Sequence, residues 1–336
     1  MKRLAALPLE GIVFLYFLFY LPNVVITRWA ATVPNVGLGR PLTGLETLPA
    51  ALTVNLVLTL LFIWLSGWHR DAKAVEVGKW RIPRPDKLTF LSGIGTALVL
   101  FTVPLSYTFQ GVSIPFIQLI MRGDILLIAP LVDIVFGRRV RWWSWTALGM
   151  VLVAMIVTLS DRGGLKLPPL AILTVVLYTL GYFIRLAVMT RIGKNGDEAI
   201  VRRYFVEEKI VALPLSIAFL AAVSASGIGG QSGELYWGFV EVWSDPAIVP
   251  LTGIGITLTV VSVFAIMILL DPRENAYCVP LERAASLVAG VGGSVLLALF
   301  FAGKMPRTAE FIGAAILIGA IVLLSLAPRF SKKTTT

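Results

Sequence analysis

The chain has 336 residues, of which 57% are hydrophobic and only 14% are charged, and its mean hydropathy is +0.86. Soluble domains carry about 25% charged residues, so this composition excludes a soluble protein and predicts a multi-pass membrane protein. The net charge of +10 is interpreted as loop charge that orients the chain in the bilayer, and no nucleic-acid partner is expected. One cysteine and one histidine exclude an internal disulfide and a Cys/His metal cluster, and we expect no cofactor.

Ten apolar runs, separated by charged or Pro/Gly-rich breaks, predict ten transmembrane helices. The first run follows Lys2 and Arg3 as in a secretory signal, but Glu10 interrupts it, and we interpret it as an uncleaved helix. The predicted fold class is therefore an all-α integral membrane protein. The predicted spans are residues 9–27, 50–67, 88–108, 111–136, 142–160, 168–190, 209–226, 248–270, 277–302 and 309–327.

The distribution of lysine and arginine predicts the orientation of these spans. If the N-terminus is cytoplasmic, the cytoplasmic segments hold 20 of the 29 basic residues, the outer segments hold six, and three lie within spans. An excess of basic residues on the cytoplasmic side is typical of membrane proteins, so both termini are predicted to be cytoplasmic. We expect the protein in the cell (inner) membrane. It is predicted to contact the lipid bilayer. The sequence leaves open whether two copies form a homodimer.

Three sequence echoes, in the same order in both halves, indicate an internal repeat. The tyrosines of "LYFLFY" (15–20) recur 162 residues later in "LYTLGY" (177–182), and "LSGIGTALVLFTV" (91–103) recurs 160 residues later as "LTGIGITLTVVSV" (251–263). The third echo equates Gly137, Arg141 and Gly149 with Gly303, Arg307 and Gly313. The repeat predicts two five-helix units, 1–162 and 163–336, in one transmembrane domain. Because five is odd, the second unit is inverted relative to the first, an arrangement typical of transporters with a site near the midplane.

The helix-pair endings "GRRVRWWSWTALGMVLVAMIVTL" (137–159) and "GKMPRTAEFIGAAILIGAIVLL" (303–324) are similar to those of the drug/metabolite transporter superfamily. Together with ten spans and a 5+5 repeat, the chain resembles in particular the EamA-like permeases of that superfamily. "PNVVITRWA" (22–30) is also similar to the first helix of its phosphate-sugar branch. The turns at 137–139 and 303–304 lack the Glu that many EamA repeats carry. The resemblance implies transport of a small-molecule solute.

Ionisable residues within the predicted spans are the candidate site residues, because charge inside a bilayer is expensive and usually functional. Arg122 and Asp124 lie mid-span in "IQLIMRGDILLIAP", where an ion pair to another helix is the alternative. Arg185, whose repeat counterpart is Asn23, lies near a span end, where snorkelling towards water is the alternative. Arg122, Arg185, Arg283 and Asn23 are predicted to bind the solute.

Glu282 and Arg283 are neighbours in the ninth span, and we expect them to face apart, with one of them meeting Arg185. Asp124 or Glu282 is predicted to carry a coupling proton, since burial favours the protonated carboxyl. Tyr20 and Tyr182, from the two related helices, complete the predicted solute site, with simple packing as the alternative. Asp133, near Arg138, is expected to be an interfacial partner of the basic loop.

These residues favour a secondary-active transporter that moves a small anionic or zwitterionic metabolite by alternating access, because arginine binds carboxylate and phosphate in a bidentate way. An efflux pump for cationic or lipophilic compounds is the first alternative. A membrane-embedded transferase or an accessory subunit belongs to a different class. No predicted span contains histidine and no phosphate-binding glycine loop is present, so no enzyme activity is expected.

Overall fold

The computed structural model describes residues 8–77, 80–106, 117, 121, 128–130, 132–160, 169–194, 197–227, 229–301 and 305–333. Most of the predicted fourth span, with the candidate residues Arg122 and Asp124, lies outside this described part.

Long helices dominate the described chain. In chain order they are α2 (Leu9–Ala30), α3 (Gly44–Ser66), α4 (Lys87–Ser106), α6 (Trp142–Ser160), α7 (Pro169–Ile192), α8 (Glu198–Ser226), α9 (Gly229–Phe239), α10 (Ile248–Leu269), α11 (Asn275–Phe300) and α12 (Thr308–Lys333). Short 3-10 turns, η1 (Trp68–Arg70) and η2 (Glu241–Ser244), follow α3 and α9. Two strands, β1 (Ala74–Val77) and β2 (Trp80–Pro83), precede α4.

Six of the helices in the described part (α2, α3, α7, α8, α10 and α11) are long and apolar enough to cross a bilayer. α4, α6 and α12 contain shorter apolar stretches. Large apolar side chains point outward from these helices, among them Phe14, Trp64 and Val176, which are more than half exposed. Apolar surface of this kind is stable in lipid, so the chain is a multi-pass membrane protein.

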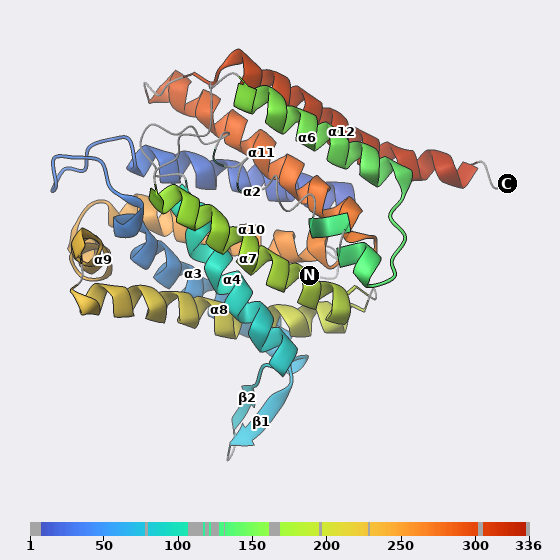
Figure 1. The fold of residues 1–336 in the computed structure, drawn as a ribbon. Coiled ribbons are helices and arrows are strands. Elements are labelled where there is room, and N and C mark those ends of the chain that lie inside the picture. Colours follow the sequence, from blue (N-terminus) through green and yellow to red (C-terminus); the bar gives the residue numbers. More distant parts are fainter. Residues whose placement is uncertain are drawn as a thin grey trace.

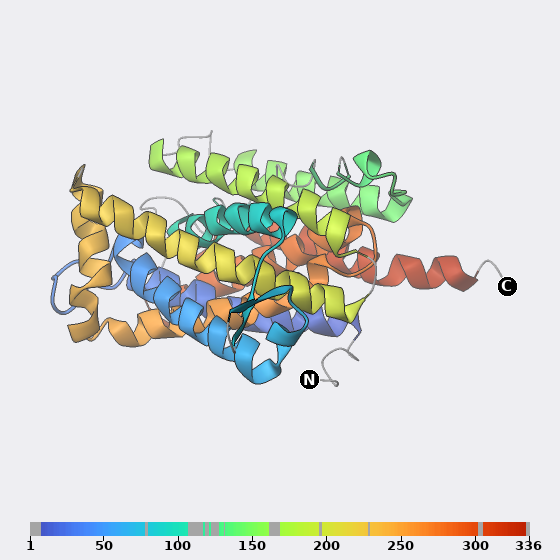
Figure 2. The same ribbon diagram turned by 90° about the horizontal axis from the view of Figure 1, so that it is seen from below.

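The helices form one bundle in which neighbours in space are often far apart in sequence. α6 and α12 lie side by side on one flank, followed by α11 and then α2, while α8 lies on the opposite flank (Figure 1). In the interior α4 packs against α7 and α8, and α10 packs against α2 and α3. α9 closes one end of the bundle, as both views show (Figures 1 and 2).

The described chain is mainly helical, as predicted for an all-α membrane protein, and β1 and β2 add an antiparallel hairpin that projects from the bundle (Figure 1). The register pairs Val75 with Ile82 and Glu76 with Arg81. Alternating apolar and charged residues in "AVEV" and "WRIP" suit a two-stranded ribbon outside the membrane. Between the predicted spans 50–67 and 88–108, the sequence indicated only a charged break.

Two helices begin earlier than their predicted spans. α3 starts at Gly44 because Thr43 and Glu46 form a reciprocal capping box that satisfies the first backbone N–H groups. α8 starts at Glu198, eleven residues before the predicted boundary at 209, and the Asp197 carboxylate caps it by accepting from Ala199 N. The prediction that residues 198–208 form a loop is therefore wrong, and this stretch contributes to the candidate site.

Candidate functional site

A buried ion pair lies in α11, within the interior of the bundle. Arg283 Nε is 3.1 Å from Glu282 Oε2, and both side chains are about 95% buried. The second oxygen, Glu282 Oε1, accepts a 2.7 Å hydrogen bond from the hydroxyl of Tyr16 on α2. The expectation that Glu282 and Arg283 face apart is wrong, because both side chains are long enough for their heads to meet when no water competes for them.

Four tyrosines from two helices surround this pair. On α7, the ring of Tyr182 lies 4.1 Å below the Arg283 guanidinium and the ring of Tyr178 lies 5.8 Å away. On α2, Tyr16 and Tyr20 contact each other with ring centroids 5.3 Å apart. The spacing of four residues puts each tyrosine pair on one helix face, and both faces turn inward. A guanidinium between aromatic faces and a carboxylate is stabilised by cation–π attraction as well as by charge.

This tyrosine cluster retains unused hydrogen-bonding capacity. Among the described residues, the Tyr182 hydroxyl has no hydrogen-bond partner, although Tyr182 is 99% buried. Buried polar groups are rarely left unpaired in proteins, since each one costs about 1–3 kcal/mol. The cluster of Tyr16, Tyr20, Tyr182, Glu282 and Arg283 is therefore suited to receive a polar ligand. We call these five residues the central cluster.

Arg185 belongs to a second buried pair and not to the central cluster. Its Nε donates to Glu208 Oε1 at 2.8 Å, and Glu208 is completely buried in α8. Hydroxyls of Thr96 on α4 and Tyr204 on α8 donate to the same carboxylate oxygen, at 2.5 Å and 3.3 Å. The predicted pairing of Arg185 with Glu282 or Arg283 is thus wrong.

Glu208 was missed because "RRYFVEEKI" (202–210) looks like a charged loop. The signal was present in the helical spacing of Tyr204, Glu208 and Ala212, all of which face the interior on α8.

Asn23, the predicted counterpart of Arg185, also has a packing role. Its side-chain amide donates to Thr257 Oγ1 at 2.8 Å and to the carbonyl of Ile254 at 3.3 Å, both on α10. These bonds attach α2 to α10 away from the central cluster. Of the predicted solute-site residues in the described part, Tyr20, Tyr182, Glu282 and Arg283 come together, and Asn23 and Arg185 do not.

A cavity of about 690 Å³ opens between α3, α8 and α10. Its rim carries Asp71, Glu198, Arg202 and Asp271, and its interior is mainly apolar. It extends inward to Ile12 on α2, one helical turn before Tyr16. Asn55, beside the cavity-lining Thr259, accepts from Thr59 and Thr259, and its buried amide nitrogen has no partner in the described chain. Through Ile12 the wall of the cavity comes within one helical turn of Tyr16, although no residue of the central cluster lines the cavity.

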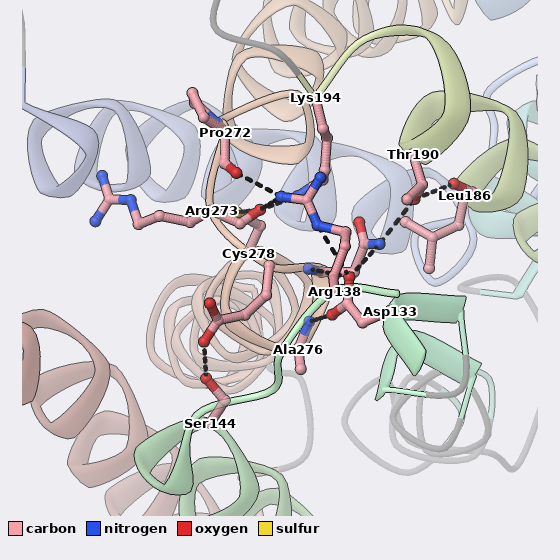
Figure 3. Close-up of polar contacts among 12 residues, drawn as sticks. Asp133, Arg138, Ser144, Leu186, Thr190, Lys194, Pro272, Arg273, Ala276 and Cys278 are labelled. Carbon is pink, nitrogen blue, oxygen red and sulfur yellow. Dashed lines mark hydrogen bonds and ion pairs between the residues drawn. The ribbon is translucent and has the colours of Figure 1, made fainter. Parts of the chain in front are cut away.

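A polar network holds the first turn of α11 at the same end of the bundle (Figure 3). Both oxygens of the buried Asp133 carboxylate are used: Oδ1 accepts from Asn275 N at 3.0 Å, and Oδ2 accepts from Ala276 N at 2.7 Å. Asp133 thereby caps α11 from another part of the chain. Asn275 also donates to Thr190 on α7 at 2.7 Å, which joins α7 to α11.

The turn that precedes α11 is fixed by basic side chains. Lys194 donates to the carbonyl of Arg273 at 2.7 Å, and Arg138 donates to the carbonyls of Pro272 and Arg273 (Figure 3). Arg138 also lies 3.6 Å from Asp133, so the expected pairing of Asp133 with the basic loop is confirmed. Burial opposes the charge on Arg273, but the hydrogen bond to Asp271 and the attraction of the Asp271 charge together outweigh burial and raise the pKa of Arg273. We call the contacts of Asp133, Arg138, Thr190, Lys194 and Asn275 the α11 lock.

The described residues include no group of three His, Cys, Asp or Glu side chains close enough to hold a metal ion.

Comparison with known proteins identifies the fold and names no function. No family model and no curated protein matches the sequence. A solved structure described only as "Crystal structure of protein" has the same fold, with a TM-score of 0.60 over 95% of this chain and 97% of that one. The two sequences are 15% identical, so the likeness concerns the fold alone.

Proposed function

We propose that this protein is a secondary-active transporter that moves a small anionic or zwitterionic metabolite by alternating access. The observation that carries the proposal is the central cluster, where a buried Arg283 is held by one carboxylate and two aromatic rings. A pair this costly to bury is weak evidence for stability and better evidence for a site. Glu282, between Tyr16 and Arg283, is placed to exchange a coupling proton when a solute takes its place on the guanidinium.

The charge of the interior favours an anionic or zwitterionic solute. Around the two buried pairs lie three basic side chains, Arg185, Lys209 and Arg283, and two acidic ones, Glu208 and Glu282; each is at least 94% buried. Among these described residues one positive charge is in excess, and it lies beside Glu208, whereas Glu282 and Arg283 balance each other. A solute carboxylate or phosphate would replace Glu282 on Arg283, because arginine binds both groups in a bidentate way.

We further propose ten spans in a 5+5 inverted repeat, as in the drug/metabolite transporter superfamily that the sequence resembles. The packing of the described helices supports this. In the proposed repeat, α2 corresponds to α7, α3 to α8 and α4 to α10. The contacts of α4 with α7 and α8 then correspond to the contacts of α10 with α2 and α3. The contact of α6 with α12 is unchanged by the same exchange.

Glycine contacts support the repeat and refine its register. A Cβ added to Gly93 would lie 2.6 Å from the Cβ of Val211 on α8, and one added to Gly255 would lie 2.6 Å from the Cβ of Val54 on α3. These contacts equate Gly93 with Gly255 at an offset of 162, the offset of the paired tyrosines. The sequence echo had equated Gly93 with Gly253, two residues away.

The surrounding structure suits alternating access. The 690 Å³ cavity opens at the end predicted to be cytoplasmic, and Asp271 and Pro272 of its rim adjoin the α11 lock. Release of the lock would free the ends of α7 and α11, which carry Tyr182 and Arg283. The solute would then be exchanged between the cavity and the central cluster.

A second candidate function is efflux of cationic or lipophilic compounds, in the same transporter class. The specific observation in its favour is the cavity itself, whose interior is mainly apolar and whose rim has three carboxylates against one arginine. Under this alternative the central cluster is structural. The solutes that bind distinguish the two candidates.

Thermal unfolding of the detergent-purified protein against metabolite pools sorted by charge tests the proposal. A ligand at a hundred times its dissociation constant stabilises the protein by about 2.7 kcal/mol, which is readily measured. We expect an anionic or zwitterionic pool to stabilise the wild type. Glu282→Gln/Arg283→Gln, which leaves no unpaired buried charge, should fold and lose this effect.

Two tyrosine variants sharpen the experiment. Tyr182→Phe removes a hydroxyl without a partner in the described chain, so it should leave unliganded stability unchanged and weaken the solute effect. Tyr236→Phe, on a half-exposed side chain of α9, is the matched control. Equal stabilisation of the wild type and the Glu282/Arg283 variant would refute the central cluster as the site. Stabilisation by cationic or lipophilic pools alone would favour efflux, and no effect of any pool would favour an accessory or enzymatic role.

A further inference from the structure

A second concave site lies outside the central cluster, at the start of α6 and α11. It encloses about 420 Å³ and is lined by Arg138, Arg139, Arg141, Trp143, Pro272, Arg273, Glu274 and Tyr277. This volume falls within the range of about 300–1,000 Å³ that is usual for small-molecule sites. Four arginines and one glutamate give the lining an excess of positive charge. We call it the arginine pocket.

The four arginines divide into two that build the wall and two that remain available. Arg138 is bound to backbone carbonyls and lies near Asp133, and Arg273 pairs with Asp271 at 2.8 Å. Arg139 and Arg141 are exposed, and neither has a carboxylate partner within the described part of the chain. The Arg141 guanidinium lies over the Trp143 ring at 5.1 Å, an arrangement that leaves its outer N–H groups free to bind an anion.

The other groups at the pocket limit the competition for these arginines. Glu274, the acidic residue of the lining, accepts a 2.9 Å hydrogen bond from Ser144 Oγ, so this carboxylate is already engaged. Tyr277 accepts from Arg273 at 3.0 Å and contributes a polar aromatic edge. The guanidinium groups of Arg139 and Arg141, beside the hydrogen-bonded carboxylate of Glu274, form a site for a doubly charged or diester phosphate.

The position of the pocket brings it to the surface of the bilayer. Trp142 and Trp145 flank it on α6 and are 64% and 50% exposed, as expected of residues at the level of the lipid headgroups. Basic pockets between transmembrane helices on the cytoplasmic side are suited to anionic headgroups. A phosphate reaching the pocket can therefore come from a lipid or from solution.

We propose that the arginine pocket binds a phosphate group, with Arg139 and Arg141 as its anion ligands. The site is independent of the solute site in the central cluster. Arg138 belongs both to the pocket wall and to the α11 lock, and the carbonyl of Arg273 accepts from Arg138 and Lys194. A bound phosphate would therefore strengthen the lock by lowering the mutual repulsion of the arginines.

Native mass spectrometry and thermal unfolding of the detergent-purified full chain test this proposal. The probes are phosphatidylglycerol, phosphatidylcholine and inorganic phosphate. We expect the wild type to retain phosphatidylglycerol or to be stabilised by inorganic phosphate, and Arg139→Ala/Arg141→Ala to lose at least about tenfold in apparent affinity, or 1.4 kcal/mol. Both substitutions are on exposed side chains, so folding should be preserved. Arg70→Ala/Arg84→Ala, which removes two exposed arginines elsewhere, is the control.

The outcomes separate the two sources of phosphate. Retention of phosphatidylglycerol over phosphatidylcholine, lost in the double variant, identifies a lipid headgroup. Stabilisation by inorganic phosphate without lipid selectivity, lost in the same variant, identifies a soluble phosphate compound. Binding that is absent, or that is equal in the wild type and the Arg139/Arg141 variant, would overturn the proposal.

Discussion

Two buried arginines, Arg185 and Arg283, differ in how completely their partners satisfy them. Arg185 donates to a fully buried Glu208 that also receives hydroxyl groups from Thr96 and Tyr204. Arg283 has one carboxylate, shared with Tyr16, and otherwise contacts aromatic faces. The first arrangement is closed, and the second leaves donors available, which is the reason for assigning Arg283 and not Arg185 to the solute site.

The closed pair predicts a stability effect without a solute effect. Arg185→Leu leaves the Glu208 carboxylate buried and unpaired, and should reduce the free energy of unfolding by about 3–5 kcal/mol. Arg185→Leu/Glu208→Leu should recover part of this loss, because the unpaired carboxylate is removed while the buried Lys209 loses the charge that faces it. Thermal unfolding of the two variants measures the difference. A folded Arg185→Leu protein of normal stability that no longer responds to solute would place Arg185 in the site instead.

The sequence predicted four members of the central cluster. Glu282 and Arg283 were chosen because ionisable residues in apolar runs are conspicuous, and Tyr20 and Tyr182 because they recur in "LYFLFY" and "LYTLGY". Glu208 was missed because the acidic and basic residues around it give the stretch "RRYFVEEKI" the composition of a loop. The direction of a long side chain is also not contained in helical spacing, which is why Glu282 and Arg283 were expected to face apart.

Among the elements, α4 and α7 approach most closely where two glycines meet. A Cβ added to Gly95 would lie 2.5 Å from the carbonyl oxygen of Gly181, and one added to Gly181 would lie 2.5 Å from that of Gly95. Small residues allow such backbone contact between transmembrane helices. The contact holds α7, and with it Tyr182, against the rest of the bundle.

Gly95→Ala should therefore destabilise the protein by about 1–3 kcal/mol, since backbone atoms must move apart to admit the methyl group. Gly149→Ala on α6 is the matched control: a Cβ there meets nothing within 4 Å, and the better helix propensity of alanine should stabilise by up to about 1 kcal/mol. Thermal unfolding compares the two. Equal stability of both variants would show that the α4–α7 contact is looser than described.

The start of α11 depends on Asp133, which lies more than 140 residues earlier in the sequence. Cys278, in the first turns of α11, is fully buried and is the single cysteine of the chain. Its reactivity therefore reports on whether the α11 lock is closed.

Asp133→Asn replaces one acceptor oxygen of the cap by an amide donor, and should raise the rate of Cys278 modification by a maleimide about tenfold or more, since charge-assisted bonds contribute roughly 1.5–3 kcal/mol. Asp197→Asn, which alters the cap of α8 far from Cys278 in the sequence, controls for capping in general. A rate that is unchanged in Asp133→Asn would mean that the lock does not gate this end.

For the whole molecule, apolar length and composition predicted a mainly helical multi-pass membrane protein, because the bilayer imposes both, and six of the described helices are long and apolar enough to span it. The hairpin β1–β2 and the early start of α8 lie in or beside polar segments, where that constraint is absent. Contacts between helices distant in sequence, such as those of α2 with α10 and α11, have no local signal and required the structure.

We propose that solute binding at Arg283 controls access at the ends of α7 and α11. The rate of Cys278 modification in sealed vesicles by an impermeant maleimide, applied at the face that carries the start of α11, tests this. We expect the stabilising anionic or zwitterionic pool to slow modification several-fold in the wild type and to have no effect in Glu282→Gln/Arg283→Gln. A rate that the pool does not change in the wild type, or slows equally in both proteins, would contradict it.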